Sequence, residues 1–458
     1  MKEYVPFANT NPLQLLILLS ACSEIFSFHN INKTDEEHET SLDTCHESEL
    51  FPDDSDKWLK APEIIKKYGY PVEIHHVTSE DGYILEFHRI PWSPHAPPRG
   101  REPPKPVLVQ HGIMASSVNW VLPPLDSALG YILADLGYDV WLGNCRGSSY
   151  SLGHTNPRMQ HTNTKYWDFS WHEMGVYDVP AMIDYILDFT NHTQLTYIGH
   201  SMGATMFFVA MSLRPEYNEK VEMMYALAPV AFCGHATSFF KLLAPFSYNL
   251  EKLYQILGRG QLIPERLRTF LNPLMADICH HTEQINCGIC NNLYFALFNS
   301  NGKQLNYTML PIYFSHFPDR VSTKTVSHYG QLLVSGKFQQ FDNRLVVPSL
   351  FPHKHPLISV GKRPEEYDFK KITVPIVLFW AERDNLADPK DVAMLIKRLP
   401  NVHMAIKVCY PLFNHNDFLF GVHVSELVYE KLIKILHYKN YKVDVECEET
   451  YVDQKKKV

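Results

Sequence analysis

The sequence predicts an α/β protein built on a mostly parallel central sheet. Short runs of β-type residues alternate with helical stretches over most of the 458 residues, which is the order that parallel strands joined by crossover helices produce. The run Val374–Trp380 is almost wholly apolar, as expected of a strand that helices cover on both faces.

Local signals place the individual elements. A helix is expected over Asp178–Phe189, where Pro180 lies in the first turn and its missing N–H does no harm. Another helix should begin after Asp388, a good N-cap, with Pro389 in its first position. Further helices are expected at Leu125–Leu136 and Ala204–Leu213, and strands at Val72–Val77, Tyr83–Ile90, Val107–Gln110, Tyr138–Leu142, Leu195–Gly199, Met223–Leu227, Val374–Trp380 and Met404–Tyr410.

The alternation stops between about Cys233 and Glu365, in a block rich in aromatic and aliphatic residues with scattered helical patterns. This block is interpreted as one large insertion rather than an independent domain. We expect a signal peptide at 1–23, an acidic flexible segment at 24–60, a core in two parts at 61–231 and 366–439, the insertion at 232–365 and a charged tail at 440–458.

Charge and hydropathy exclude some classes of protein. The net charge is −8, and residues 33–57 alone hold ten acidic and only two basic residues, so the rest of the chain is balanced. No basic stripe suggests nucleic acid as a partner, and no apolar run approaches the ~18 residues of a transmembrane helix.

The N-terminus favours the secretory pathway. Leu13–Leu19 has the length of a signal-peptide apolar region, and Ala21-Cys22-Ser23 supplies small residues for cleavage. Glycosylation sequons begin at Asn32, Asn191 and Asn306. We expect a secreted or lysosomal protein.

Three of the nine cysteines, Cys279, Cys287 and Cys290, cluster within the insertion. Cys287 and Cys290 form a C-x₂-C pair of the kind that binds zinc, but no second pair completes a tetrahedral set. In an oxidising compartment one disulfide and one leftover thiol are the expected outcome. No metal or organic cofactor is expected.

The strongest chemical signal is Gly199-His200-Ser201-Met202-Gly203. A predicted strand precedes it and a predicted helix follows it, which is the strand–turn–helix context of a nucleophile elbow. The tight turn exposes the Ser201 hydroxyl, and the helix N-terminus favours a developing negative charge.

A serine hydroxyl needs a base and an acid to act as a nucleophile. His415, in Phe413–Phe418 after the last predicted strand, is the expected base, and His423 is a less suitable alternative. The expected acid, just past Val374–Trp380, is Asp384, with Glu382 and Asp388 as competitors.

Two backbone N–H groups should form an oxyanion hole. One belongs to Met202, the residue after the nucleophile, and the other to Ile113, in the loop that follows the predicted strand Val107–Gln110 and begins with His111-Gly112.

Together these motifs resemble the acid lipases, the group of gastric and lysosomal triacylglycerol and cholesteryl ester hydrolases. The resemblance runs from about Pro62 to about Ile435. It is carried by Ile64–Pro91, HGIMASSVNW at His111, GYDVWLGNCRG at Gly137, GHSMG at Gly199, YALAPVA at Tyr225, SGKFQQFD at Ser335, LADPKDV at Leu386 and FNHNDF at Phe413.

The resemblance implies an α/β-hydrolase fold with a large, mainly helical cap and lid insertion. It also implies a triad of Ser201, Asp384 and His415, oxyanion donors on Ile113 and Met202, and one disulfide within the cysteine cluster of the insertion. The chain departs from the family at Met202, where Gln is usual, at Cys145, where Ser is usual, at Ala381-Glu382, where two glycines are common, and over the divergent segment Asn343–Tyr367.

The leading hypothesis is a serine lipase or esterase that cleaves lipid esters at an oil–water or membrane interface through an acyl-enzyme. The alternatives are a carboxylesterase or thioesterase acting on soluble esters, and a non-catalytic lipid-binding protein on a hydrolase scaffold. The sequence leaves the oligomeric state open.

Overall fold

The computed structural model describes residues 54–97, 103–237, 260–280, 304–348 and 357–438. Within these ranges a nine-stranded sheet has the order β1-β2-β4-β3-β6-β7-β10-β11, with β5 paired to β2. β2 runs antiparallel to its neighbours, and every pairing from β4 to β11 is parallel. The strands are β1 (Glu73–Thr78), β2 (Tyr83–Ile90), β3 (Pro106–Gln110), β4 (Asp139–Gly143), β5 (Gly153–His154), β6 (Leu195–His200), β7 (Val221–Leu227), β10 (Ile376–Trp380) and β11 (Val402–Lys407).

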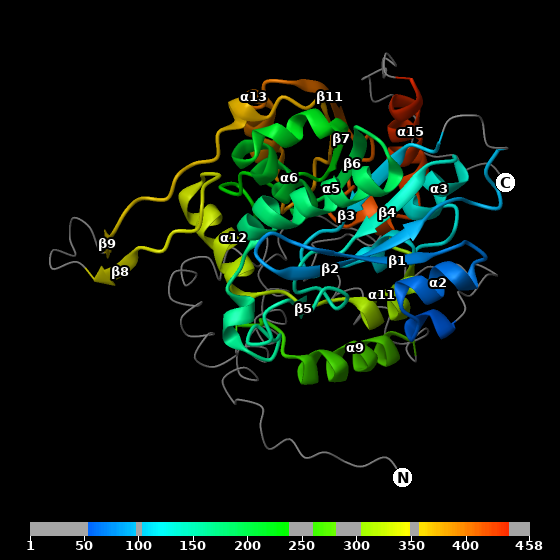
Figure 1. Cartoon of the computed structure of the whole chain (residues 1–458), viewed down its shortest axis with the longest axis horizontal. Helices are drawn as coiled ribbons and strands as arrows, with labels where there is room; N and C mark the ends of the chain where they lie inside the picture. The colour runs from blue at the N-terminus through cyan, green and yellow to red at the C-terminus, as the bar shows by residue number, and fades with distance from the viewer. Residues whose placement is uncertain (1–53, 98–102, 238–259, 281–303, 349–356, 439–458) are drawn as a thin grey trace, which may run out of the picture. The chain divides into compact units, whose positions relative to one another are not determined.

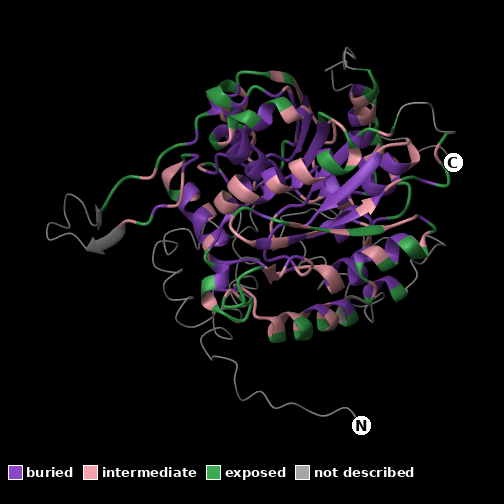
Figure 2. Ribbon diagram, viewed as in Figure 1, coloured by how far each residue is buried: buried purple, intermediate pink, exposed green. Residues whose placement is uncertain are grey.

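The predicted α/β fold with a mostly parallel sheet is confirmed. The central strands β3, β4 and β6 are buried at every position, because helices pack against the sheet. Figure 2 shows the buried residues concentrated on these strands and on the inner sides of the helices. The helices of the core are α2 (Ala61–Lys67), α3 (Leu129–Asp135), α4 (Trp171–Glu173), α5 (Val179–Thr190), α6 (Met202–Leu213), α13 (Pro389–Arg398), α14 (Asp417–Phe420) and α15 (Glu430–His437).

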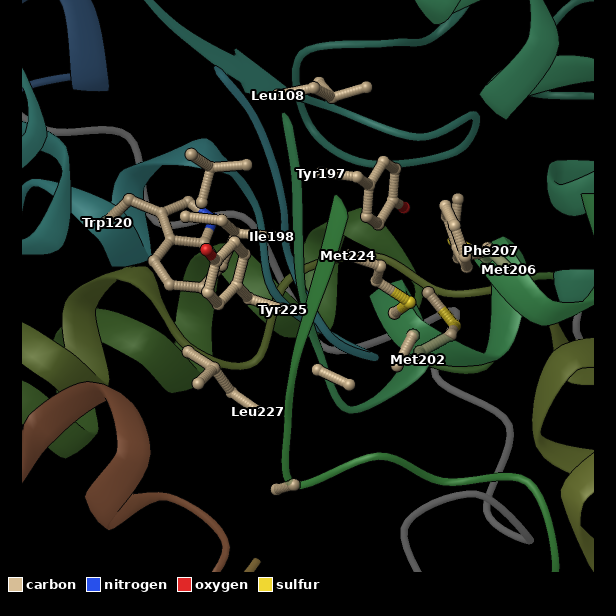
Figure 3. Close-up of a cluster of buried hydrophobic side chains, with 14 of the residues drawn as sticks. Leu108, Trp120, Tyr197, Ile198, Met202, Met206, Phe207, Met224, Tyr225 and Leu227 are labelled. Atoms are coloured by element: carbon tan, nitrogen blue, oxygen red, sulfur yellow. The ribbon is translucent and has the colours of Figure 1, made fainter. Parts of the chain in front are cut away.

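Helix α6 is buried at every position from Met202 to Ser212. Its Phe207 ring packs on Tyr197 of β6 with ring centroids 4.8 Å apart (Figure 3). The Tyr197 hydroxyl also donates a hydrogen bond of 2.9 Å to the carbonyl of Gly203. The core therefore fixes α6 to β6 on both sides of the turn that joins them.

A buried arginine ties β4 to the start of α5. Arg146 lies within 2.6 Å of both Asp178 and Asp81, and its guanidinium is 4.0 Å from the centre of the Tyr83 ring. Buried charges require such pairing, since an isolated charge in the interior is strongly destabilising.

The predicted insertion separates β7 from β10. Its described elements are α9 (Glu265–His280), the short 3-10 helix η7 (Tyr307–Met309), α11 (Leu310–His316), α12 (Thr323–Ser335) and the antiparallel pair β8 (Leu345–Pro348) and β9 (Leu357–Val360). Ser322 caps α12 and Gly336 ends it in a left-handed conformation. The β8–β9 pair lies in the divergent segment, where the sequence indicated no strands, and extends away from the core in Figure 1.

Helix α12 packs on the core next to α6. The Tyr329 hydroxyl is 2.9 Å from Thr205 Oγ1, and His328 Nδ1 is 2.9 Å from Ser170 Oγ. Trp171 stacks on the His328 ring with centroids 3.7 Å apart. The insertion therefore contacts the helix that begins at Met202.

Part of the predicted flexible segment 24–60 is folded. Residues Asp54–Lys57 form a 3-10 helix, and the buried Asp56 pairs with Lys67 and accepts a hydrogen bond from Tyr68. The backbone carbonyl of Asp56 also bonds to His316 of the insertion, at 2.8 Å. These contacts give the end of an acidic segment a fixed position. The remaining 24–53, the predicted signal peptide and the predicted tail at 440–458 lie outside the described residues, as does Asn32.

The state of three cysteines is known in the described part of the chain. Cys145 and Cys233 are free and buried, whereas Cys409, which the sequence did not single out, is disulfide-bonded. The expected pairing among Cys279, Cys287 and Cys290 falls outside the side chains that the structure describes.

Among the described helices, none is long and apolar enough to span a membrane.

Candidate active site

Ser201 lies in a strained turn between β6 and α6. Its backbone has φ 53° and ψ −114°, a region that residues with side chains rarely adopt. Gly199 and Gly203 make the turn possible because they have no side chain where backbone segments approach each other closely. A Cβ on Gly203 would lie 2.5 Å from the carbonyl oxygen of Gln110, and one on Gly199 would lie 2.8 Å from the carbonyl carbon of Gly203.

The structure brings the three predicted residues Ser201, His415 and Asp384 together. His415 Nε2 is 2.8 Å from Ser201 Oγ, and His415 Nδ1 is 2.8 Å from Asp384 Oδ2. A carboxylate only accepts hydrogen bonds, so Nδ1 carries the ring proton and Nε2 accepts from the serine hydroxyl. All three residues are at most 5% exposed.

The Asp384 carboxylate is held in place by the backbone. Its Oδ1 accepts the N–H groups of Leu386, at 2.9 Å, and Ala387, at 2.8 Å. These bonds satisfy the oxygen that does not make the shorter contact with His415. The carboxylate therefore has a fixed orientation toward the imidazole.

The competing residues from the sequence have other positions. Glu382 is exposed and pairs with Lys407 at 2.6 Å. Asp388 caps α13, as predicted, by accepting the N–H of Lys390 at 2.8 Å. His423 is about half-exposed and lies 3.8 Å from Glu426.

The loop after β3 lies against the nucleophile turn. A Cβ on Gly112 would lie 3.2 Å from Ser201 Cβ, so the absence of a side chain there allows the loop backbone to approach the serine closely just before Ile113. Met202 is the first residue of α6, where backbone N–H groups point out of the helix. Gly112, the residue before the predicted donor Ile113, therefore packs against Ser201, and the predicted donor Met202 follows Ser201 in the chain.

The His111 side chain stabilises the loop after β3 through two hydrogen bonds. Its Nδ1 donates to the carbonyl of Gly112 at 2.8 Å, and its Nε2 accepts the N–H of Cys145 at 3.3 Å. Burial lowers the pKa of His111 to about 4, so the ring is neutral with one donating and one accepting nitrogen. Next to the loop, the Met114 carbonyl accepts the N–H of Asp319 from the insertion, at 2.8 Å.

Asp417 is a buried residue of this site that the sequence analysis did not single out. Its Oδ2 accepts the N–H of Asn414 at 2.9 Å and so closes the short loop that carries His415. Burial, opposed by the Asn414 hydrogen bonds and reinforced by the charge of Asp384, raises the pKa of Asp417 to about 7. Its position two residues after His415 was the available signal.

Two of the three sequons fall on described residues. Asn191 is exposed and ends α5 in a left-handed conformation. Asn306 is half-buried, and its Oδ1 accepts hydrogen bonds from the N–H and hydroxyl of Thr308. The turn at Asn191 therefore presents the more accessible acceptor.

Comparison with known proteins identifies the family of the chain. The family model for the alpha/beta hydrolase fold matches residues 105–422, and one for a partial alpha/beta-hydrolase lipase region matches residues 61–123. Lipase 1 of Drosophila melanogaster is 36% identical over 83% of this chain and 80% of its own length. Bovine gastric triacylglycerol lipase is 35% identical over 82% of this chain and 91% of its own length. Human lipase member K is 36% identical over 82% of this chain and 90% of its own length.

The Asp417→Asn variant should gain stability relative to the wild type as the pH rises. The folded state holds the Asp417 proton up to about pH 7, whereas an unfolded aspartate releases it near pH 4, so the wild type loses stability between these values. Asparagine does not titrate and still accepts the Asn414 N–H. Urea unfolding should show a gain of at most about 4 kcal/mol at pH 7.5 and little difference at pH 4. Equal destabilisation at both pH values would contradict this account.

Proposed function

The chain belongs to the lipases of the α/β-hydrolase fold, and on that premise we propose that it hydrolyses carboxylic esters of lipids, triacylglycerols or cholesteryl esters, through an acyl-enzyme. One observation carries the proposal: Ser201, His415 and Asp384 form a continuous chain of hydrogen bonds at a strained strand–helix turn. That arrangement activates a serine for attack on a carbonyl carbon.

In the proposed first half-reaction, Ser201 Oγ attacks the ester carbonyl and His415 Nε2 takes the hydroxyl proton. Asp384, bonded to Nδ1, keeps the imidazole in the accepting tautomer and stabilises the imidazolium. The N–H groups of Ile113 and Met202 would receive the oxyanion, and the positive end of α6 adds to its stabilisation. The alkoxide then leaves as an alcohol with the proton from His415.

In the second half-reaction a water molecule replaces the alcohol. His415 accepts a proton from this water as its oxygen attacks the acyl-enzyme carbonyl, and the same oxyanion donors serve again. When the tetrahedral intermediate collapses, the bond to Ser201 Oγ breaks and His415 returns the proton to that oxygen. The products are the free serine and a carboxylic acid.

Lipid esters are the substrate class that the relatives and the insertion support. The relatives are named as lipases, and two of the insertion's contacts border the site. Tyr329 of α12 contacts Thr205, one turn from Ser201, and Asp319 contacts Met114, next to Ile113. We infer that this part of the insertion forms a wall of the acyl-binding site.

We also infer that the protein enters the secretory pathway and is secreted or lysosomal. The apolar run Leu13–Leu19 and the small residues around Cys22 support a cleaved signal. The exposed position of Asn191 supports glycosylation there.

Substitutions in the triad should act as one unit. Ser201→Ala and His415→Ala should each reduce kcat by roughly 10⁴-fold or more, and the double variant should lose little beyond either one. Asp384→Asn should also be severe, because it disturbs the tautomer of His415. Glu382→Gln is the matched control and should stay near wild type, since Glu382 faces solvent. Esterase activity retained by Ser201→Ala would refute the mechanism.

Activity should rise steeply once the ester exceeds its solubility. The test is to measure initial rates through the solubility limit of each substrate. Triacylglycerol emulsions, cholesteryl ester particles and short soluble esters together distinguish a lipase from an esterase for soluble substrates. A lipase gains activity when an interface appears. Ordinary saturation below the limit, with no activity on emulsions, would instead support an esterase or thioesterase for soluble substrates.

Expression of the full chain in mammalian cells should give a glycosylated protein whose N-terminus lies near Ser23. Glycosidase treatment should lower its mass, and Thr193→Ala should remove the glycan at Asn191 while Thr193→Ser keeps the sequon. An unglycosylated cytosolic protein that retains Met1 would overturn the assignment.

A further inference from the structure

His200, the residue before the nucleophile, makes a second link between the nucleophile turn and the loop that carries His415. Its Nε2 lies 3.1 Å from the backbone carbonyl oxygen of His415, and the two rings have centroids 5.0 Å apart. His200 is 3% exposed. The mechanism described above makes no use of this contact.

The contact fixes the tautomer of His200. A carbonyl oxygen only accepts, so Nε2 carries the proton and Nδ1 presents a lone pair. That Nδ1 is buried without a hydrogen-bond partner, and it lies 3.1 Å from the position that a Cβ on Gly112 would occupy. The ring is therefore enclosed between the nucleophile turn, the His415 loop and the loop of the proposed oxyanion hole.

We propose that His200 is a positioning residue. It holds the backbone of His415 in the position from which His415 Nε2 reaches the Ser201 hydroxyl. The inference rests on the proposed triad. Asp384 restrains the His415 ring through Nδ1, but a ring can still shift with its backbone. The hydrogen bond from His200 restrains the backbone itself, and Asp417 closes the same loop on its other side through Asn414.

The surroundings keep this link uncharged. Burial lowers the pKa of His200 to about 3, with smaller contributions from two neighbouring rings, His415 in the loop after β11 and His111 in the loop after β3. The hydrogen bond to the His415 carbonyl opposes this shift only in part. A neutral His200 does not oppose the positive charge that His415 acquires during the reaction, including at acid pH.

A matched pair of substitutions tests the role. The amide nitrogen of Gln reaches about as far as imidazole Nε2, whereas that of Asn ends near Nδ1. His200→Gln should lower kcat on a soluble ester only about threefold, whereas His200→Asn should lower it about 10- to 100-fold, the scale expected when a reacting group is misplaced by about 1 Å. KM should change less than about twofold in both, and labelling by a fluorophosphonate should slow in parallel with kcat.

The outcomes separate this inference from the proposed function. If Ser201→Ala is inactive while His200→Asn turns over like wild type, the positioning role is wrong and the triad stands. Equal losses in Gln and Asn variants with wild-type thermal stability would also refute it. If Ser201→Ala stays active, the proposed function itself fails.

A measurement on the wild-type protein covers the case in which His200→Asn does not fold. Hydrogen exchange at the imidazole Cε1, followed by mass spectrometry of the peptide that contains His200, reports its titration. His200 should exchange slowly and show no titration between about pH 5 and 8. Fast exchange with a midpoint near the ordinary histidine value of about 6.5 would show that the ring is open to solvent rather than enclosed against the His415 loop, and would overturn the proposal.

Discussion

The backbone strain at Ser201 is the constraint on which the site depends. A residue with a side chain in this conformation costs about 1–3 kcal/mol, and the conformation persists only where its surroundings impose it. Here they do, because Ser201 N–H donates to Leu227 of β7 at 3.0 Å, and the Ser201 carbonyl accepts N–H groups from α6 at 3.0 and 3.2 Å. The contact of Gly203 with Gln110 brings in β3. Three strands and one helix must therefore pack correctly before the serine is presented.

The sequence predicts much of this arrangement, because the responsible signals are local. Apolar runs identify the central strands to within about two residues, and the neighbouring Pro389 marks Asp388 as a helix cap. The elbow glycines and the order of serine, acid and histidine pointed to the three residues that the structure brings within hydrogen-bond reach. The sequence does not predict the short strand β5 or the β8–β9 pair. Each of these strands has at most four residues, too few to show an alternation of apolar and polar side chains.

Contacts between distant residues were beyond the sequence analysis. His200 and His415 are 215 positions apart, and Tyr329 meets Thr205 across 124 positions. Residue type alone does not distinguish His200 or Asp417 from the chain's other histidines and aspartates, because their importance comes from burial and from a single backbone partner. The insertion is harder still: Pro273 lies inside α9, where sequence rules would end a helix.

The insertion and the site are physically connected through Asp319. Its N–H bonds to Met114, and its carboxylate accepts the N–H and the hydroxyl of Ser149 from the segment after β4. A substrate that displaced this part of the insertion would also act on the loop that carries Ile113. Hydrogen bonds therefore link this part of the insertion to the loop of the proposed oxyanion donor Ile113.

Three buried titratable residues next to His415 keep one protonation state through the mildly acidic pH range. His111 and His200 are buried and neutral, with pKa values of about 4 and 3, and Asp417 keeps its proton up to about pH 7. Between about pH 4 and 7 none of the three adds a charge beside the triad. Because added positive charge would oppose a positive charge on the proposed base, and added negative charge would favour its protonation, this constancy keeps the electrostatic surroundings of the proposed triad unchanged over that range.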